Sequence, residues 1–286
     1  MNGKRPLIAG VGEALWDMLP TGKQCGGAPA NVAYHARKLG ADSTVVSAVG
    51  RDADGDELLE LLTSKGLDCR FVTRNLLPTG TVSVSLENGI PAYDIHQPAA
   101  WDAIECTQEL EAVLPEMDAV VFGSLAQRDP RSRETIRHIL RSVPEKCLRV
   151  FDVNLRQDFY GKEMLEESLK LSNVFKLNEE ECGVMSALFA PWLGREEILK
   201  LIAERFGLEY VILTLGADGS MLYDGREFTH YPVAPCPRIE DTVGCGDSFL
   251  AAWCVAILNG ETPDAAMRAA SLVSAKVAGQ KGAMAD

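Results

Sequence analysis

The stretch Asp241-Thr242-Val243-Gly244-Cys245-Gly246-Asp247-Ser248-Phe249 places two glycines between two acids, where an irregular segment leads into an apolar helix. Gly244 and Gly246 permit backbone angles that residues with a Cβ resist. Successive free N–H groups at a helix start form a concave site for an anion. The helix N-terminus favours an ionised Asp247, whereas a bound phosphate opposes its ionisation. The stretch therefore indicates either a base beside a phosphoryl group or a glycine turn capped by Asp247.

The composition is that of an ordinary globular protein, with 286 residues, 47% of them apolar and 24% charged. The net charge of −13 argues against nucleic acid and anionic membranes as main partners, because both attract basic surfaces. No apolar run approaches the roughly 18 residues of a membrane span, and the N-terminal run is too short for a signal peptide. The eight cysteines lack C-x-x-C spacing, so we expect reduced thiols and a cytoplasmic location.

The first motif towards the N-terminus is a buried strand followed by acids. The apolar run from Leu7 to Val11 predicts the strand, which ends at Gly12-Glu13, and Asp17 follows. Acids just past a strand end lie where open α/β sheets bind ligands. Gly10-x-Gly12 lacks the third glycine of a dinucleotide fingerprint, since Leu15 stands there, so we reject that interpretation.

A second glycine-rich segment, Cys25-Gly26-Gly27-Ala28-Pro29, opens a helix predicted from Ala30 to Leu39. Its two glycines let another group approach the backbone closely. Asn31 lies one turn into the helix and is able to face that group. The alternative for Asn31 is a polar residue on a solvated helix face.

The segment from Thr79 to His96 departs from the rest of the chain. Alternating residues from Thr81 to Leu86 and from Tyr93 to His96 predict two strands, and Asn88-Gly89 between them is a strong hairpin turn. A two-stranded unit with one small face is not stable alone. We therefore expect it to cover a cleft or another subunit, as a lid, with His96 at the surface rather than acting as a base.

Apolar strands then alternate with helices, which predicts an α/β fold with a mostly parallel sheet covered on both faces. The strands are predicted over residues 118–123, 148–153, 174–177 and 210–214, and the helices over 131–142, 195–206, 249–258 and 263–278. No internal repeat or low-complexity linker is present. We expect one large domain over residues 1–286 with a small β excursion.

Polar residues follow three of these strands. They are Asn154 with Arg156, Asn178 with Glu181, and Thr214 with Gly216. Because the carboxyl ends of parallel strands share one edge, these residues indicate a common crevice. Arg156 can pair with a phosphate or a carboxylate, and Glu181 can hold hydrated Mg²⁺. The alternative for Asn178 and Glu181 is a capping box at a helix start.

Several of these motifs, in this order, resemble the PfkB, or ribokinase-like, family of sugar and nucleoside kinases. They are Gly26-Gly27-Ala28-Pro29-Ala30-Asn31-Val32-Ala33, Asn178-x-x-Glu181, Thr214-Leu215-Gly216-x-x-Gly219 and the stretch quoted first. Cys245 departs from the usual Ala, and the chain stops at Asp286 where the family normally continues. The segments from Gly12 to Pro20 and from Gly26 to Tyr34 most resemble bacterial fructokinases. The resemblance implies a ribokinase-like α/β fold with a β lid formed by segments of about 13–25 and 79–98.

The family's catalytic residues correspond here to the stretch quoted first and to one arginine. Asp247 would deprotonate the sugar's primary hydroxyl. The N–H groups of Gly244, Cys245 and Gly246 would stabilise charge on the transferring phosphoryl group. Arg156 would reach the sugar or the phosphates.

The family's binding residues correspond to the remaining motifs. Sugar hydroxyls would be bound by Asp17, Gly27 and Asn31, with Glu13 and Tyr93 as further candidates. Asn178 and Glu181 would position Mg²⁺ through water, and Thr214, Gly216 and Gly219 would contact the nucleotide. Asp241, with the backbone near Val243 and Gly282, would hold a monovalent cation, K⁺.

The resemblance implies an ATP-dependent sugar kinase, with fructose as the leading substrate. Ribokinase, 2-keto-3-deoxygluconate kinase and nucleoside kinase activities remain alternatives within the family. A non-catalytic sugar- or nucleotide-binding regulator is the alternative from another class. The expected partners are the sugar, ATP and a second copy of the chain, paired through the lid.

Overall fold

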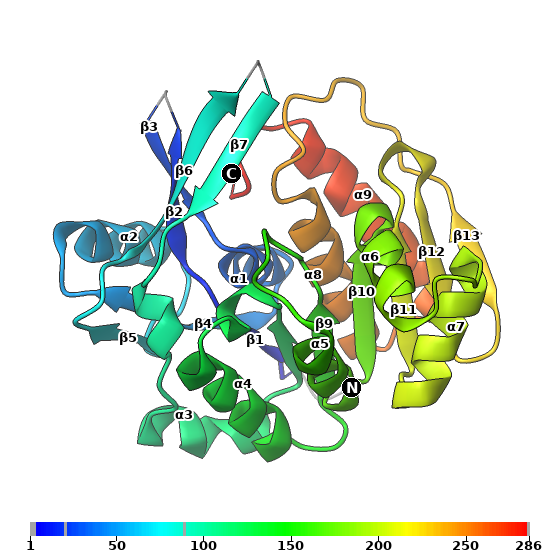
Figure 1. The fold of residues 1–286 in the computed structure, drawn as a ribbon, viewed down its shortest axis with the longest axis horizontal. Helices are drawn as coiled ribbons and strands as arrows, with labels where there is room; N and C mark the ends of the chain where they lie inside the picture. The colour runs from blue at the N-terminus through cyan, green and yellow to red at the C-terminus, as the bar shows by residue number, and fades with distance from the viewer. Residues whose placement is uncertain (1–3, 20–21, 88–89, 285–286) are drawn as a thin grey trace.

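The computed structural model describes residues 4–19, 22–87 and 90–284 and is built around a nine-stranded sheet (Figure 1). The strand order is β13-β12-β11-β10-β9-β8-β1-β4-β5. The strands are β1 (Leu7–Val11), β4 (Asp42–Gly50), β5 (Val72–Asn75), β8 (Ala119–Phe122), β9 (Leu148–Asp152), β10 (Val174–Asn178), β11 (Tyr210–Thr214), β12 (Ser220–Tyr223) and β13 (Phe228–Tyr231). All neighbours pair in parallel except β11 with β12 and β12 with β13.

Helices cover both faces of this sheet, because successive residues of each strand point to opposite faces. Helices α1 (Ala28–Lys38), α8 (Cys245–Leu258) and α9 (Pro263–Ala278) pack on the face that carries Val150 and Val174. Helices α3 (Gln108–Val113), α4 (Pro130–Ser142), α5 (Lys162–Lys170), α6 (Glu179–Phe189) and α7 (Arg195–Phe206) pack on the face that carries Phe151 and Phe175. Helix α2 (Ala53–Ser64) buries Leu58 and Leu62 in a third cluster with α1 and β4.

A second sheet stands at one edge of the molecule, at the top left of Figure 1. Its order is β3-β2-β6-β7, with β2 (Leu15–Leu19), β3 (Gly22–Gly26), β6 (Gly80–Glu87) and β7 (Ile90–Ile95). β6 pairs antiparallel with β7 and parallel with β2. The predicted hairpin is confirmed. Its turn, Asn88-Gly89, lies outside the described residues, and the side chains of 84–93 are not described.

The α/β architecture and the mostly parallel sheet expected from the sequence are confirmed. The strands at 7–11 and 210–214 and the helices at 195–206 and 263–278 agree with prediction at both ends. The strands β2, β3, β5 and β13 and the helices α3 and α5 were not predicted as elements. Helix α8 begins at Cys245, four residues earlier than predicted, so Gly246 and Asp247 lie in its first turn.

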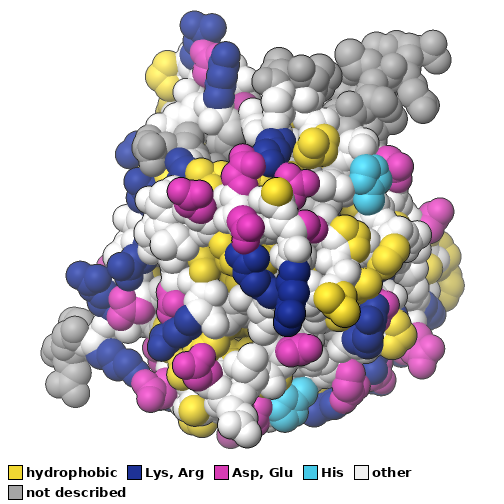
Figure 2. Space-filling view, turned by 90° about the vertical axis from the view of Figure 1, so that its left-hand side faces the viewer, with side chains coloured by type: hydrophobic (Ala, Val, Ile, Leu, Met, Phe, Trp, Pro, Cys, Tyr) yellow, Lys and Arg dark blue, Asp and Glu magenta, His cyan; other side chains and the backbone are white. Residues whose placement is uncertain are grey.

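Exposed acidic and basic side chains are interspersed on the face shown in Figure 2, without a continuous basic patch. Within the described residues, no helix is long and apolar enough to cross a membrane. All eight cysteines carry free thiols.

Candidate active site

The acids that follow β1 pack against the start of α1. Asp17 lies on β2, and Glu13 lies in the turn between β1 and β2, where it is 3% exposed. A Cβ added at Gly26 would lie 2.5 Å from Asp17 Oδ2, and one added at Gly27 would lie 2.3 Å from the Glu13 carbonyl oxygen. The two glycines therefore admit the segment that carries both acids, which is the close approach expected from the sequence.

The two most distant motifs meet in one hydrogen bond. Asn31 Nδ2 on α1 donates to Asp247 Oδ2 on α8 over 2.7 Å. Asn31 is 4% exposed, and its Oδ1 has no partner within the described chain. The solvated-face alternative for Asn31 is therefore wrong. The Asn31 side chain fixes the carboxylate of Asp247 and keeps an acceptor free for a ligand.

Helix α8 begins with the turn expected from its glycines, but the two glycines serve different purposes. Gly244 is left-handed at φ 78°, and a Cβ there would lie 2.7 Å from Ala283 Cα. Gly246 has no positive φ, so the expectation of unusual backbone angles is wrong at that position. A Cβ at Gly246 would instead lie 3.2 Å from Lys176 Nζ.

The backbone N–H groups of this turn are not equivalent. The Cys245 N–H donates to the Thr242 carbonyl over 3.2 Å, so it is engaged in the turn. The N–H groups of Gly244 and Gly246 have no acceptor within the described chain. Two of the three predicted donors are therefore available to an anion at the start of α8.

Burial dominates the charge state of the acids at this site. It raises the pKa of Asp247 to about 6, with the charge of Asp152 as the next cause, while Asn31, Lys176 and Arg156 oppose the rise. Burial also raises the pKa of Glu13 to about 7. A carboxyl poised near neutrality can both give and accept a proton under physiological conditions.

Arg156 lies in the loop after β9 and supplies positive charge to the same acids. Its charge lowers the pKa values of Glu13, Asp17 and Asp247 against the effect of burial. The side chain is exposed, and Nη1 donates to the Leu155 carbonyl over 2.9 Å. Asn154, in the same loop, has a left-handed backbone at φ 40°, which non-glycine residues rarely adopt. A cavity of about 350 Å³ separates this loop, at Gln157, from the end of β7.

The residues after β10 form the predicted capping box. Asn178 Oδ1 accepts from the Glu181 N–H over 2.9 Å, and Glu181 Oε2 accepts from the Asn178 N–H over 2.8 Å. Glu181 Oε1 also accepts from the Leu155 N–H over 3.0 Å. Both carboxylate oxygens therefore have a donor, although each keeps a lone pair for a water. This arrangement fits a hydrated Mg²⁺ ion better than direct ligation.

The residues after β11 have a more structural character. Thr214 Oγ1 donates to the Leu177 carbonyl over 3.4 Å, and the exposed Gly216 is left-handed at φ 58°. Gly219 is also left-handed, and a Cβ there would lie 2.1 Å from the Tyr231 carbonyl oxygen. Thr214 and Gly216 thus lie at the shared strand edge, whereas Gly219 is required by the approach of β13.

The three residues predicted at the monovalent-cation site lie together. Asp241 Oδ1 accepts from the Val243 N–H over 3.0 Å, and Oδ2 accepts from the Gly282 N–H over 3.1 Å. The carboxylate thus joins the loop before α8 to the C-terminal segment, and each oxygen retains a lone pair for a cation.

Sequence reasoning missed a buried ion pair beneath α8. Lys176 Nζ on β10 lies 2.9 and 3.1 Å from the two carboxylate oxygens of Asp152 on β9, and both residues are under a tenth exposed. The signal available was a lysine inside the apolar run Val174-Phe175-Lys176-Leu177. Tyr93, predicted to contact substrate, lies outside the part of the chain with described side chains.

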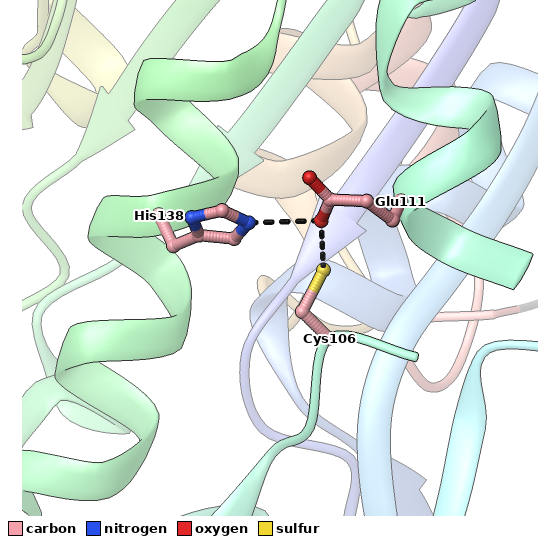
Figure 3. A group of neighbouring side chains, drawn as sticks. All are labelled: Cys106, Glu111 and His138. Atoms are coloured by element: carbon pink, nitrogen blue, oxygen red, sulfur yellow. Dashed lines mark hydrogen bonds and ion pairs between the residues drawn. The ribbon is translucent and has the colours of Figure 1, made fainter. Parts of the chain in front are cut away.

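A potential metal-binding group lies elsewhere, between α3 and α4 (Figure 3). Glu111 Oε2 accepts from Cys106 Sγ over 3.2 Å and lies 2.8 Å from His138 Nε2. Burial and the Glu111 carboxylate together raise the pKa of Cys106 to about 12, so the thiol is protonated. These contacts tie the loop before α3 to α4, and no other described residue joins the group.

Comparison with known proteins identifies relatives along the whole chain. The model of the pfkB family of carbohydrate kinases matches residues 20–286. An uncharacterized sugar kinase of Pyrococcus horikoshii is 32% identical over 276 residues, which cover 90% of this chain and 84% of the relative. Its crystal structure with ATP has a TM-score of 0.81, covering 97% of this chain and 94% of that one.

Two further relatives differ in the names of their substrates. The ATP-dependent 6-phosphofructokinase of Thermoanaerobacterium thermosaccharolyticum is 27% identical and covers 100% of this chain and 92% of its own. A fructokinase of Klebsiella pneumoniae is 29% identical, and the match covers 92% of this chain and 87% of the relative.

Proposed function

Because this chain belongs to the pfkB family of carbohydrate kinases, we propose that it transfers the γ-phosphoryl group of ATP to the primary hydroxyl of fructose. The observation that carries the proposal is the hydrogen bond between Asn31 and Asp247. It joins the two signature segments in one buried site, beside two N–H groups at a helix start that find no acceptor among the described residues. A base beside an anion-binding turn is the arrangement that phosphoryl transfer requires.

Asp247 acts as the general base. With a pKa raised to about 6, its carboxylate is ionised at neutral pH yet basic enough to accept the proton of the attacking hydroxyl. The hydrogen bond from Asn31 holds the carboxylate in one orientation. The N–H groups of Gly244 and Gly246 donate to the oxygens of the transferring phosphoryl group, and Arg156 supplies positive charge from the opposite loop.

The strand ends after β10 and β11 bind the nucleotide. Asn178, Thr214 and Gly216 lie at this edge, with Glu181 beside them. Glu181 would hold Mg²⁺ through water, and the ion would neutralise charge on the phosphates. Asp241, with the backbone at Val243 and Gly282, would hold K⁺.

The acceptor is a neutral sugar rather than a sugar phosphate. Glu13, Asp17 and Asp247 border the proposed sugar position; Arg156 acts on the charge of all three, and Lys176 acts on Asp247 as well. Carboxylates accept hydrogen bonds from sugar hydroxyls, but they repel a second phosphate. This argues for fructokinase activity, for which the Klebsiella relative is named, over 6-phosphofructokinase activity, for which the Thermoanaerobacterium relative is named.

The second sheet serves as the lid. Its strand β2 carries Asp17, and the end of β7 borders the cavity beside the Arg156 loop. The outer strands, β3 and β7, leave two sheet edges, and pairing between copies would cover such an edge. We place the resulting homodimer in the cytoplasm, where thiols stay reduced.

The test is turnover of a panel of acceptors, measured as ADP formation with ATP and Mg²⁺. The panel contains fructose, ribose, 2-keto-3-deoxygluconate, a nucleoside and fructose 6-phosphate. We expect the highest kcat/KM with fructose. A higher value with another acceptor would reassign the substrate, and no turnover of any acceptor by folded protein would overturn the proposal.

A further inference from the structure

A buried lysine lies directly beneath the turn that carries Asp247. Lys176 is 7% exposed, and it faces Asp152 in the register of β10 with β9. Both side chains share the sheet face of Val150 and Val174, two residues earlier on each strand, which is the face covered by α8. The ion pair thus occupies positions where the fold elsewhere places valine.

Stability does not explain this pair. Replacing a buried ion pair with apolar residues of similar volume is often neutral or stabilising, because desolvation opposes the attraction between the charges. The position of Lys176 adds a further penalty, since the positive end of α8 repels a cation. Gly246 omits a Cβ that would lie 3.2 Å from Lys176 Nζ. The helix start is therefore shaped to accommodate a lysine whose pKa burial lowers but the charges of Asp152, Glu181 and Asp247 together raise.

The charges around Asp247 suggest what the pair does. Asp247 is faced by Asp152 on β9, Lys176 on β10, Asn31 on α1, Arg156 after β9 and Glu13 after β1. Asp152 and Glu13 disfavour its ionised form, whereas Lys176, Arg156 and Asn31 favour it. Lys176 is also the side chain that a Cβ at Gly246, the residue before Asp247, would meet, with Nζ 3.2 Å away.

We propose that Lys176 is a positioning residue that keeps Asp247 ionised beside Asp152 and supports the first turn of α8 from below. Asp152 in turn holds the Lys176 ammonium in place through both carboxylate oxygens. The inference rests on the proposed function, because Asp247 matters to turnover as the base.

The decisive variants are Lys176→Met and the double variant Asp152→Asn/Lys176→Met. Lys176→Met leaves the Asp152 charge uncompensated, so Asp247 should be protonated at a higher pH. The acid limb of the kcat/KM profile, which is its fall at low pH, should therefore move up by about one pH unit or more. At a pH on that limb, the rate should fall about tenfold. The double variant removes both charges, so its acid limb should return towards that of the wild type. Its Tm should equal or exceed that of Lys176→Met.

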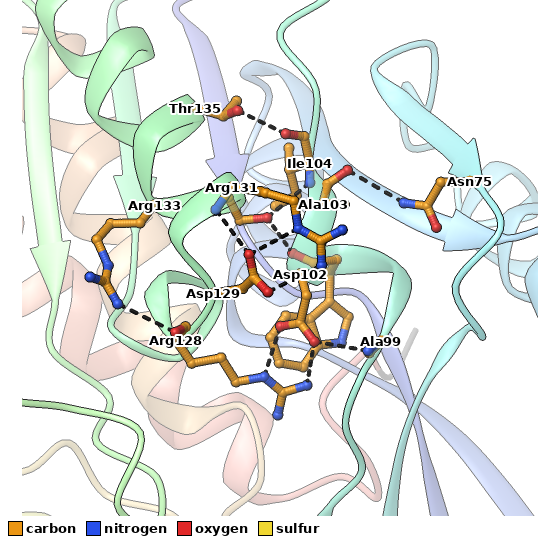
Figure 4. A network of polar contacts seen from close by, with 12 residues as sticks. Asn75, Ala99, Asp102, Ala103, Ile104, Arg128, Asp129, Arg131, Arg133 and Thr135 are labelled. Carbon is orange, nitrogen blue, oxygen red and sulfur yellow. Dashed lines mark hydrogen bonds and ion pairs between the residues drawn. The ribbon is translucent and has the colours of Figure 1, made fainter.

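A matched control is the buried pair of Arg128 with Asp102, far from Asp247 in the chain. Arg128 Nε donates to Asp102 Oδ1 over 2.8 Å and Nη2 donates to Oδ2 over 2.9 Å (Figure 4). Both side chains are 5% exposed or less. Asp102→Asn/Arg128→Met should lower Tm without moving the acid limb.

A second readout separates this inference from the kinase proposal. This readout is the carboxyl ¹³C chemical shift of Asp247, followed by NMR as a function of pH without substrate and assigned with Asp247→Asn. The titration midpoint should be raised in Lys176→Met and should return towards that of the wild type in the double variant. An unchanged Asp247 midpoint in folded Lys176→Met would overturn the inference. A midpoint that stayed raised in the double variant would also overturn the inference, because packing rather than charge would then be responsible. A shifted midpoint without turnover would reject the kinase proposal alone.

Discussion

At the scale of single residues, Asp247 gives the most direct prediction. Asp247→Asn preserves the volume and an acceptor for Asn31, but it removes the basic oxygen. We expect kcat to fall by about 10²- to 10⁴-fold, the usual contribution of a general base, while ATP affinity stays close to that of the wild type. Steady-state kinetics and calorimetric titration with ATP measure the two effects.

The pH profile of the wild type provides the companion measurement. Because the pKa of Asp247 is raised to about 6, kcat/KM of the wild type should fall as pH drops through that value. The residual activity of Asp247→Asn should not show this fall. A variant that turned over sugar at a near-normal rate would remove Asp247 from the role of base.

Glu13 makes a separate prediction about stability. Burial raises its pKa from 4.5 to about 7, so the folded protein keeps a proton that the unfolded chain has already lost. Ionisation of Glu13 therefore opposes folding, and the contribution of Glu13 to stability decreases as pH rises from about 4.5 to 7. Glu13→Gln should gain up to about 3 kcal/mol relative to the wild type across this window. Urea unfolding at pH 4.5 and pH 7.5 measures it, and an equal difference at both values would contradict it.

At the scale of elements, the start of α6 allows capping and nucleotide binding to be separated. Asn178→Ala removes the cap and should lower the free energy of unfolding by about 1 kcal/mol. Asn178→Ser retains a capping oxygen and should restore most of that stability. If Asn178 also binds the nucleotide, both variants should raise KM for ATP. An unchanged KM in the serine variant would leave Asn178 as a cap only.

The sequence predicted elements best where local signals agreed. The helix from Pro263 to Ala278 has a proline near its start and an unbroken run of helix formers, and the strand from Tyr210 to Thr214 is apolar throughout. Strands β2 and β3 lack such signals, because long-range pairing organises them: β2 pairs with β6 at Gly80–Glu87, and β3 pairs with β2. Tertiary pairing of this kind leaves little trace in the local sequence.

The site shows the same division. Asp247, Asn31 and Asp241 were predicted because they stand in recognisable motifs, and the structure joins Asn31 to Asp247 and Asp241 to Gly282. Lys176 and Asp152 were not predicted, because 24 residues separate them and only strand register brings them together. The reason for a glycine at position 246 was not predicted either, because it is the nearby Lys176 side chain and not an unusual backbone angle.

At the scale of the whole molecule, the lid sheet and the nine-stranded sheet share one boundary. Asp17 on β2 and Gly26 at the end of β3 connect the lid directly to the start of α1. A movement of the lid therefore carries a proposed sugar contact with it, whereas the residues after β10 and β11 belong to the large sheet. Sugar affinity should consequently depend on the lid more than ATP affinity does.

Shortening the hairpin tests this division. Replacing residues 84–93 with a Gly-Ser turn of a few residues removes the outer part of β6 and β7 but leaves Asp17 in place. We expect KM for fructose to rise at least tenfold, KM for ATP to change little, and sedimentation velocity to show a monomer. A shortened protein that remained dimeric would contradict pairing through the lid.

The segment at Gly282 and Ala283 borders the start of α8, and we expect the contacts there to make activity depend on a monovalent cation. Asp241 accepts from the N–H groups of Val243 and Gly282, and Ala283 packs against Gly244 at the start of α8. A K⁺ ion on Asp241 would stiffen the turn whose N–H groups face the phosphoryl group, so kcat should rise with K⁺ over Li⁺. Asp241→Asn lowers the charge and keeps an acceptor for only one of the two N–H groups, so it should lose this activation with a small fall in Tm of about the loss of one hydrogen bond. Equal rates in K⁺ and Li⁺ for the wild type would exclude the cation site.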